Sequence, residues 1–102
     1  MNTDVYTNVS TALIFGDLEK LKKNIGNIDN FYNFGLPLHY AVENTDIDFV
    51  NVIYEQMYKI NNDPETNGIN SINYIGMTPL MLARKERKFD IVSYLIENGA
   101  YN

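Results

Sequence analysis

Two helix signals that follow each other closely, in the last third of the sequence, constrain the fold of this chain most. Thr78 precedes Pro79, so a side chain that can cap a helix stands before the residue type favoured at the first helical position. Residues 80–83 then give a first apolar stripe, and residues 91–96 give a second at helical spacing. Gly99 supplies a C-terminal stop. The segment therefore predicts a short helical hairpin.

Residues 76–83 read GMTPLMLA, and residues 90–100 read DIVSYLIENGA. Together they closely resemble one ankyrin repeat, whose signature is G-x-T-P-L-x-x-A followed by I-V-x-x-L-L-x-x-G-A. The resemblance implies an all-α fold, an ankyrin-repeat solenoid of helix-turn-helix units with short β-hairpin-like fingers. One such repeat cannot bury both of its faces, so we expect others before it.

Two earlier segments match the same pattern. Residues 37–41 read PLHYA, and residues 49–54 read FVNVIY, as in the two helices of a second repeat. Residues 16–21, GDLEKL, resemble the turn that starts a second ankyrin helix and indicate a first repeat. We therefore predict one ankyrin-repeat domain over residues 1–102, with repeats at approximately 10–33, 34–68 and 69–102.

The repeat spacing predicts an insertion. Ala41 and Ala83 lie 42 residues apart, whereas the family period is about 33 residues. The excess falls in residues 61–68, NNDPETNG, which have turn chemistry and nothing to bury. We expect their deletion to leave the fold intact or slightly more stable, because a shorter loop costs less closure entropy.

The composition argues against several classes of protein. The chain has no Cys, which excludes a disulfide framework, and its net charge of −5 argues against nucleic-acid binding. Its one basic cluster, residues 84–88, is interrupted by Glu86 and predicts a solvated helix end. No signal peptide and no membrane-spanning run is present. We therefore expect no membrane association and an intracellular location, either cytoplasmic or in a host cytoplasm.

The sequence favours a non-catalytic protein. His39 is the only histidine, and with no Cys the chain lacks a nucleophile–base pair and a zinc ligand set. The resemblance implies that this histidine hydrogen-bonds within the repeat framework. The acidic groups 46–48 and 63–65 lack the spacing of a calcium loop. We predict no catalytic residue, metal or cofactor.

The resemblance implies a protein partner bound along the concave face, through hairpin tips and the first helices. Carried onto this sequence, the contact positions are Ile14, Phe15, Tyr32, Asn33, Glu43, Asn44, Tyr74, Ile75, Met77, Lys85 and Glu86. Exposed aromatic residues are typical interface anchors. The alternative is that some of these apolar side chains fold back onto the scaffold.

The expected function is that of a non-catalytic interaction module. Residues with AT-rich codons are frequent, so a host-directed viral or bacterial modulator is one interpretation. A self-associating structural or oligomerisation module is the alternative. Arg84 replaces a small residue that is squeezed between repeats inside an array, which favours a finished end and a monomer, with a homodimer as the alternative.

Overall fold

The computed structural model describes residues 5–28 and 37–101. Regular structure within these two ranges is entirely helical, which confirms the all-α fold, and the described finger before the last hairpin is built from turns. The helices are α1 (Val5–Phe15), α2 (Leu18–Ile25), α3 (Pro37–Asn44), α4 (Ile47–Ile60), α5 (Pro79–Lys85) and α6 (Phe89–Glu97).

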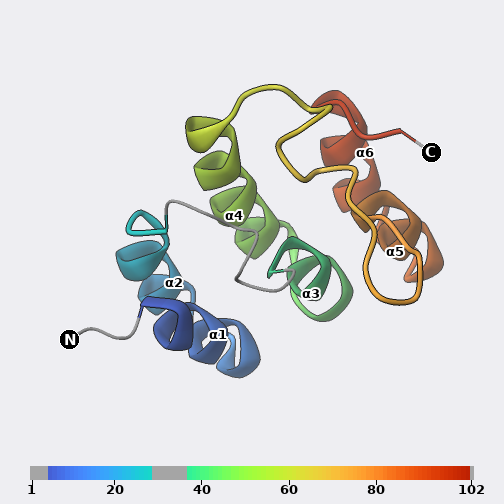
Figure 1. The fold of residues 1–102 in the computed structure, drawn as a ribbon. Coiled ribbons are helices and arrows are strands. Elements are labelled where there is room, and N and C mark those ends of the chain that lie inside the picture. Colours follow the sequence, from blue (N-terminus) through green and yellow to red (C-terminus); the bar gives the residue numbers. More distant parts are fainter. Residues whose placement is uncertain (1–4, 29–36, 102) are drawn as a thin grey trace.

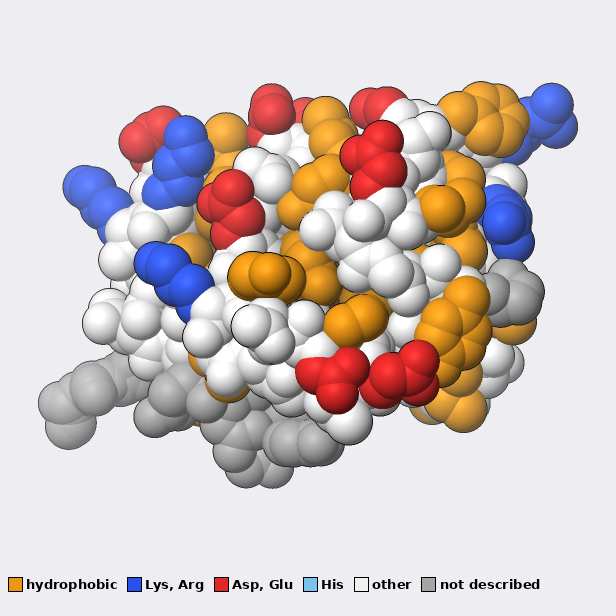
Figure 2. Space-filling model, turned by 90° about the horizontal axis from the view of Figure 1, so that it is seen from above, with side chains coloured by type: hydrophobic (Ala, Val, Ile, Leu, Met, Phe, Trp, Pro, Cys, Tyr) orange, Lys and Arg blue, Asp and Glu red, His pale blue; other side chains and the backbone are white. Residues whose placement is uncertain are grey.

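The helices form two layers, as Figure 1 shows. Helices α1, α3 and α5 lie side by side in what we call the inner layer, and α2, α4 and α6 form the outer layer. Each inner helix pairs with the outer helix that comes after it, so three hairpins stack along the chain. Figure 2 looks onto the outer layer and shows acidic side chains spread between apolar ones.

Local sequence explains where the helices begin. Asp17 caps α2, since its side chain accepts a hydrogen bond from the Lys20 amide at 3.0 Å. Asp46 caps α4 in the same way. Thr78 accepts from the Met81 amide at 3.1 Å and caps α5, with Pro79 next in the first turn, as predicted.

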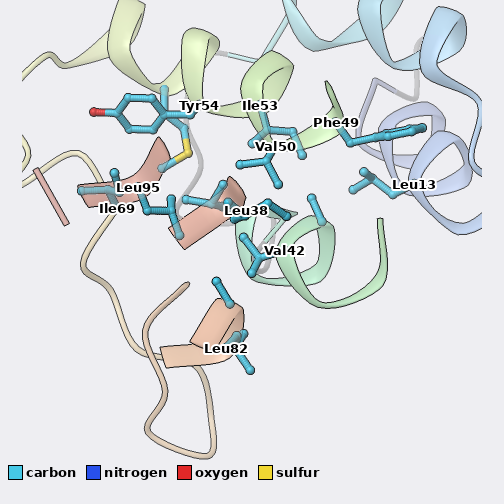
Figure 3. Close-up of a cluster of buried hydrophobic side chains, with 14 of the residues drawn as sticks. Leu13, Leu38, Val42, Phe49, Val50, Ile53, Tyr54, Ile69, Leu82 and Leu95 are labelled. Carbon is cyan, nitrogen blue, oxygen red and sulfur yellow. The ribbon is translucent and has the colours of Figure 1, made fainter. Parts of the chain in front are cut away.

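Apolar side chains from both layers meet in one core. Figure 3 shows Leu13, Leu38 and Val42 of the inner helices near Val50 and Ile53 of α4. Each of these side chains is buried. Burial of such a side chain stabilises the fold by about 1.5–3 kcal/mol, so stacking supplies the stability that a single hairpin lacks.

Lys88 occupies the position that an aspartate holds in the two earlier hairpins. Asp17 and Asp46 cap the helices after them, whereas α6 has no side-chain cap. The Lys88 ammonium instead donates to three carbonyls at the end of α3, those of Val42 at 2.8 Å, Glu43 at 3.0 Å and Thr45 at 2.9 Å. A cation at this helix end satisfies free carbonyls and opposes the negative pole of the dipole. The contact ties the third hairpin to the second.

The prediction that residues 61–68 have nothing to bury is wrong. Helix α4 continues to Ile60, and the loop after it turns back onto this helix. Asn67 is buried. Its side-chain nitrogen donates to the Tyr54 hydroxyl at 2.9 Å, and its side-chain oxygen accepts from the Ile69 backbone amide at 3.1 Å. A short polar side chain thus fills a core position, because both of its functional groups have partners.

The same loop also holds the end of the third hairpin. The side-chain amide of Asn70 donates to the backbone carbonyls of Pro64 and Gly99, each at 3.2 Å. The Tyr101 hydroxyl donates to Glu65 at 3.3 Å, and the Tyr101 amide donates to the Asn70 side chain at 2.9 Å. Through Glu65 the insertion is therefore bonded to a residue more than 30 positions later in the chain, and it acts as part of the scaffold.

We expect Asn67→Ala to lower the free energy of unfolding by about 1–3 kcal/mol, because the substitution removes partners from buried groups. Deletion of residues 61–68 is expected to cost at least as much. Urea unfolding of the wild type, the Asn67→Ala variant and the deletion variant measures both effects. Thr66→Ala is the matched control, since Thr66 is exposed in the same loop. Unchanged stability on deletion would restore the sequence-based expectation of a dispensable loop.

Candidate functional site

Residues at the C-terminal ends of the inner helices form a repeating row. Ile14, Glu43 and Lys85 occupy the same position in α1, α3 and α5, two residues after the alanine that each helix buries. Helices α1 and α3 pack together, as do α3 and α5, so the three positions lie in succession along one face. We call this row and the finger tip of residues 73–77 the inner face.

The first hairpin contributes apolar surface to the inner face. Phe15 ends α1 with 78% of its surface exposed, and Ile14 beside it is also exposed. The structure therefore does not fold these two side chains back onto the scaffold. Such a pair of exposed apolar side chains offers contact area without needing a polar partner.

The second and third hairpins contribute charges to the inner face that pair with each other. The Lys85 ammonium lies 3.9 Å from a Glu43 carboxylate oxygen and 3.8 Å from one of Glu86. The Asn44 side chain donates to the Tyr40 carbonyl at 3.3 Å. Because the ion-paired groups are partly exposed, they contribute about 1 kcal/mol or less to stability and remain open to a partner's charges.

The finger tip holds its aromatic residue in a fixed turn. The Asn73 side-chain oxygen accepts from the amides of Ile75 and Met77, each at 3.0 Å, and the Asn73 carbonyl accepts from the Gly76 amide at 2.9 Å. Gly76 has a φ of 84°, which a glycine adopts without steric cost. Tyr74 stands at the tip and is 96% exposed, with Ile75 beside it.

The base of the finger is fixed to the second hairpin by His39. Its Nε2 lies 2.9 Å from the Ser71 carbonyl oxygen and 3.1 Å from that of Met77, so this nitrogen donates the proton. Burial lowers the pKa of His39, although the two backbone hydrogen bonds act in the opposite direction. The ring is thus a neutral framework group, as the resemblance implied. Met77 is partly buried against the core and offers less surface than Tyr74.

Two of the predicted contact residues, Tyr32 and Asn33, lie outside the described residues. Sequence reasoning did not select Ile72, which is exposed on the same finger. Its signal was present in the sequence, since an isoleucine that precedes the turn residue Asn73 has no helix stripe to join. Ile72 therefore adds to the apolar surface around Tyr74.

The described ranges contain neither a cluster of metal-ligating side chains nor a long apolar helix. In the ranges that the structure describes, no group of three or more His, Asp or Glu side chains is placed to hold a metal ion. His39 is already committed to backbone carbonyls. No helix in those same ranges is long and apolar enough to cross a membrane.

Comparison with known proteins identifies the repeats. The family model described as "Ankyrin repeats (3 copies)" matches residues 9–102. A Caenorhabditis elegans protein, described as ANK repeat-containing protein nipk-1, is 34% identical over 64 residues. This alignment covers 63% of the chain and 10% of the relative, so the chain spans a small part of that protein. No solved structure matches the chain. Ankyrin repeats are generally protein–protein interaction modules, and the chain belongs to the ankyrin-repeat family.

Proposed function

We propose that the chain binds a protein partner through the inner face, with Tyr74 as the principal anchor. The observation that carries this proposal is the 96% exposure of an aromatic side chain on a turn fixed by hydrogen bonds. A protein gains no stability from an aromatic side chain left in water, whereas burial against a partner recovers its apolar area.

The rigid turn supports an anchoring role for Tyr74. Asn73 holds the turn from inside, and His39 holds its base through the Ser71 and Met77 carbonyls. A tyrosine has few side-chain torsions, so its immobilisation costs little entropy. With the backbone also fixed before binding, more of the contact energy becomes affinity.

The pattern of the inner face indicates what a partner presents. Apolar side chains lie on the first hairpin, Ile14 and Phe15, and at the finger tip, Tyr74 and Ile75. Paired charges lie around Lys85 on α5. A partner that spans this face would therefore offer apolar pockets for these two groups of side chains and polar groups near Lys85. That the partner comes from a host cell stays a prediction from the amino-acid composition.

We expect Tyr74→Ala to weaken partner binding by about 1–3 kcal/mol, because truncation of an anchor removes its buried contact area. The partner is first captured with the wild-type chain and identified by mass spectrometry. Its affinity for purified variants is then measured by calorimetry. Thermal unfolding of the Tyr74→Ala protein should stay close to wild type, since the ring touches solvent rather than core.

Tyr58→Ala is the matched control for this experiment. Tyr58 is also an exposed tyrosine, but it lies on α4 in the outer layer. We expect its replacement to leave the affinity unchanged. If Tyr58→Ala abolishes binding and Tyr74→Ala does not, the partner uses the outer layer and the inner-face assignment is wrong.

A further inference from the structure

One histidine holds both sides of the finger, residues 71–77. His39 lies on α3 and is 4% exposed. Its Nε2 donates to the carbonyl oxygen of Ser71 at 2.9 Å and to that of Met77 at 3.1 Å. These two residues flank the turn that presents Tyr74, so a single N–H group closes the base of the turn. The position of the tip therefore depends on where this ring lies.

The other nitrogen of the ring has no such contact. Nδ1 of His39 is buried and has no hydrogen-bond partner among the residues that the structure describes. The third hairpin has Thr78 at the position equivalent to residue 36, three residues before His39. Residue 36 itself lies outside the described ranges and is a leucine, whose side chain has no hydrogen-bonding group. The site therefore suits a neutral ring, in which Nδ1 carries no proton.

A protonated ring does not suit the same place. Its Nδ1 becomes an N–H donor, and the described surroundings provide no acceptor for it. A buried charge and a buried unpaired donor are both unfavourable relative to water. The ring regains hydration by moving toward solvent, and it then gives up its contacts with Ser71 and Met77. Hydration of the charged ring and closure of the finger thus exclude each other.

Burial has a larger effect on the pKa of His39 than the hydrogen bonds have. Burial lowers this pKa, whereas the bonds to the Ser71 and Met77 carbonyls raise it, and the net direction is downward from the ordinary value of 6.5. The closed finger therefore binds the proton less well than an open one. It follows that closure is most stable above pH 6.5 and is lost as the pH falls below that value.

Neighbouring charges are not a cause of this shift. Helices α1, α4 and α5 and the finger pack against α3. Helix α1 and the finger contain no charged residue, and tyrosines stay neutral below about pH 8. The described charged side chains on or beside α3, α4 and α5 are exposed or half-exposed, and they are Glu43, Asp46, Asp48, Glu55, Lys59, Arg84, Lys85 and Lys88.

We propose that the finger is a pH-sensitive element, which is closed onto α3 while His39 is neutral and is released when the ring takes up a proton. The helices keep their own caps and core contacts, so the opening is local to the finger. Release would also remove the fixed position of Tyr74. That consequence for partner binding rests on the proposed function, whereas the movement of the finger does not.

A spin label on the finger tests the proposal without a partner. The chain has no Cys, so Tyr74→Cys introduces one thiol for a nitroxide label at the tip. Between about pH 8 and about pH 4.5 the label should change from ordered to mobile. The ratio of open to closed finger should rise by up to about tenfold for each pH unit below 6.5, since one proton is bound. Because His39 is the only histidine, nuclear magnetic resonance follows its ring without ambiguity, and the two midpoints should agree.

His39→Gln is the matched variant, because glutamine can donate to a carbonyl but takes up no proton in this range. With His39→Gln the finger label should not respond to pH. A label at Phe15→Cys, on α1, should stay unchanged with His39 in place, which shows that the helices remain folded. If His39→Gln does not fold, the two labels and the ring titration in chains that keep His39 decide the question.

Several results would overturn the proposal. They are a His39 ring that titrates at or above pH 6.5, a finger label that stays ordered after the ring is protonated, an equal response with glutamine at this position, and simultaneous loss of order at the Phe15→Cys label. None of these measurements includes a partner. Their failure would therefore leave the proposed function standing, and a Tyr74→Ala variant with unchanged affinity would leave the finger result standing.

Discussion

Replacement of Lys88 by Met is expected to lower the free energy of unfolding by about 1.5–3 kcal/mol, the usual range for hydrogen bonds to a charged group. The Lys88 ammonium lies within 3.0 Å of three carbonyl oxygens at the end of α3. Methionine keeps an unbranched apolar stem that is one atom shorter, and it cannot donate. The loss should therefore report the carbonyl contacts and not a change in packing. The midpoint of urea unfolding measures it.

Lys85→Met is the control for Lys88→Met. Lys85 pairs with Glu43 and Glu86 at 3.9 and 3.8 Å, and its side chain is half exposed. We expect a loss of about 1 kcal/mol or less, as for other surface ion pairs. Equal losses for the two variants would mean that the carbonyl contacts of Lys88 contribute no more than a surface charge.

Signals from residues that are close in sequence were sufficient to predict most of the fold. Thr78 and Pro79 marked the start of α5, and Gly99 marked the end of α6. The Gly99 amide donates to the Ile96 carbonyl and the Ala100 amide donates to that of Leu95, which is a Schellman motif. Caps and stripes depend on residues within one or two turns, so they can be read without tertiary structure.

Contacts between residues that are far apart in sequence could not be predicted in the same way. The basic cluster containing Lys88 suggested a cation at a helix C-terminus, which is physically correct. The helix concerned is α3, more than 40 residues earlier, and not α5. The burial of Asn67 could not be predicted for a related reason, because a polar residue is buried only when partners such as Tyr54 are brought to it.

Repeat register was sufficient to predict that some of the proposed contact residues are exposed. Ile14, Phe15 and Tyr74 are exposed in helix-end and turn positions, as the resemblance implied. Register could not give the pairing of Lys85 with Glu43, because the rotamers of long side chains depend on the helix packing. It also could not show that Phe89 and Ile96 are exposed, since their burial depends on whether another segment packs against α6.

Gly99 joins the last helix to the insertion at close range. Its φ is 99°, in the region that favours glycine. A Cβ added there would lie 2.6 Å from Cβ and 2.8 Å from Cγ of Pro64. The proline ring cannot turn away, because Cβ and Cγ are fixed in the pyrrolidine. The insertion thus imposes a second requirement for glycine beyond the helix stop.

Gly99→Ala is therefore expected to lower the free energy of unfolding by about 2–5 kcal/mol, the sum of a left-handed backbone cost and an overpacking cost. Gly76→Ala separates these two costs, since Gly76 has a φ of 84° and no atom within 4 Å of its added Cβ. It should lose about 1–2 kcal/mol from the backbone alone. In a Pro64→Gly background the clash is gone, so Gly99→Ala should cost no more than Gly76→Ala does in the wild-type chain. A double-mutant cycle from urea unfolding measures this difference, and a coupling near zero would show that the insertion moves aside rather than packing on the last helix.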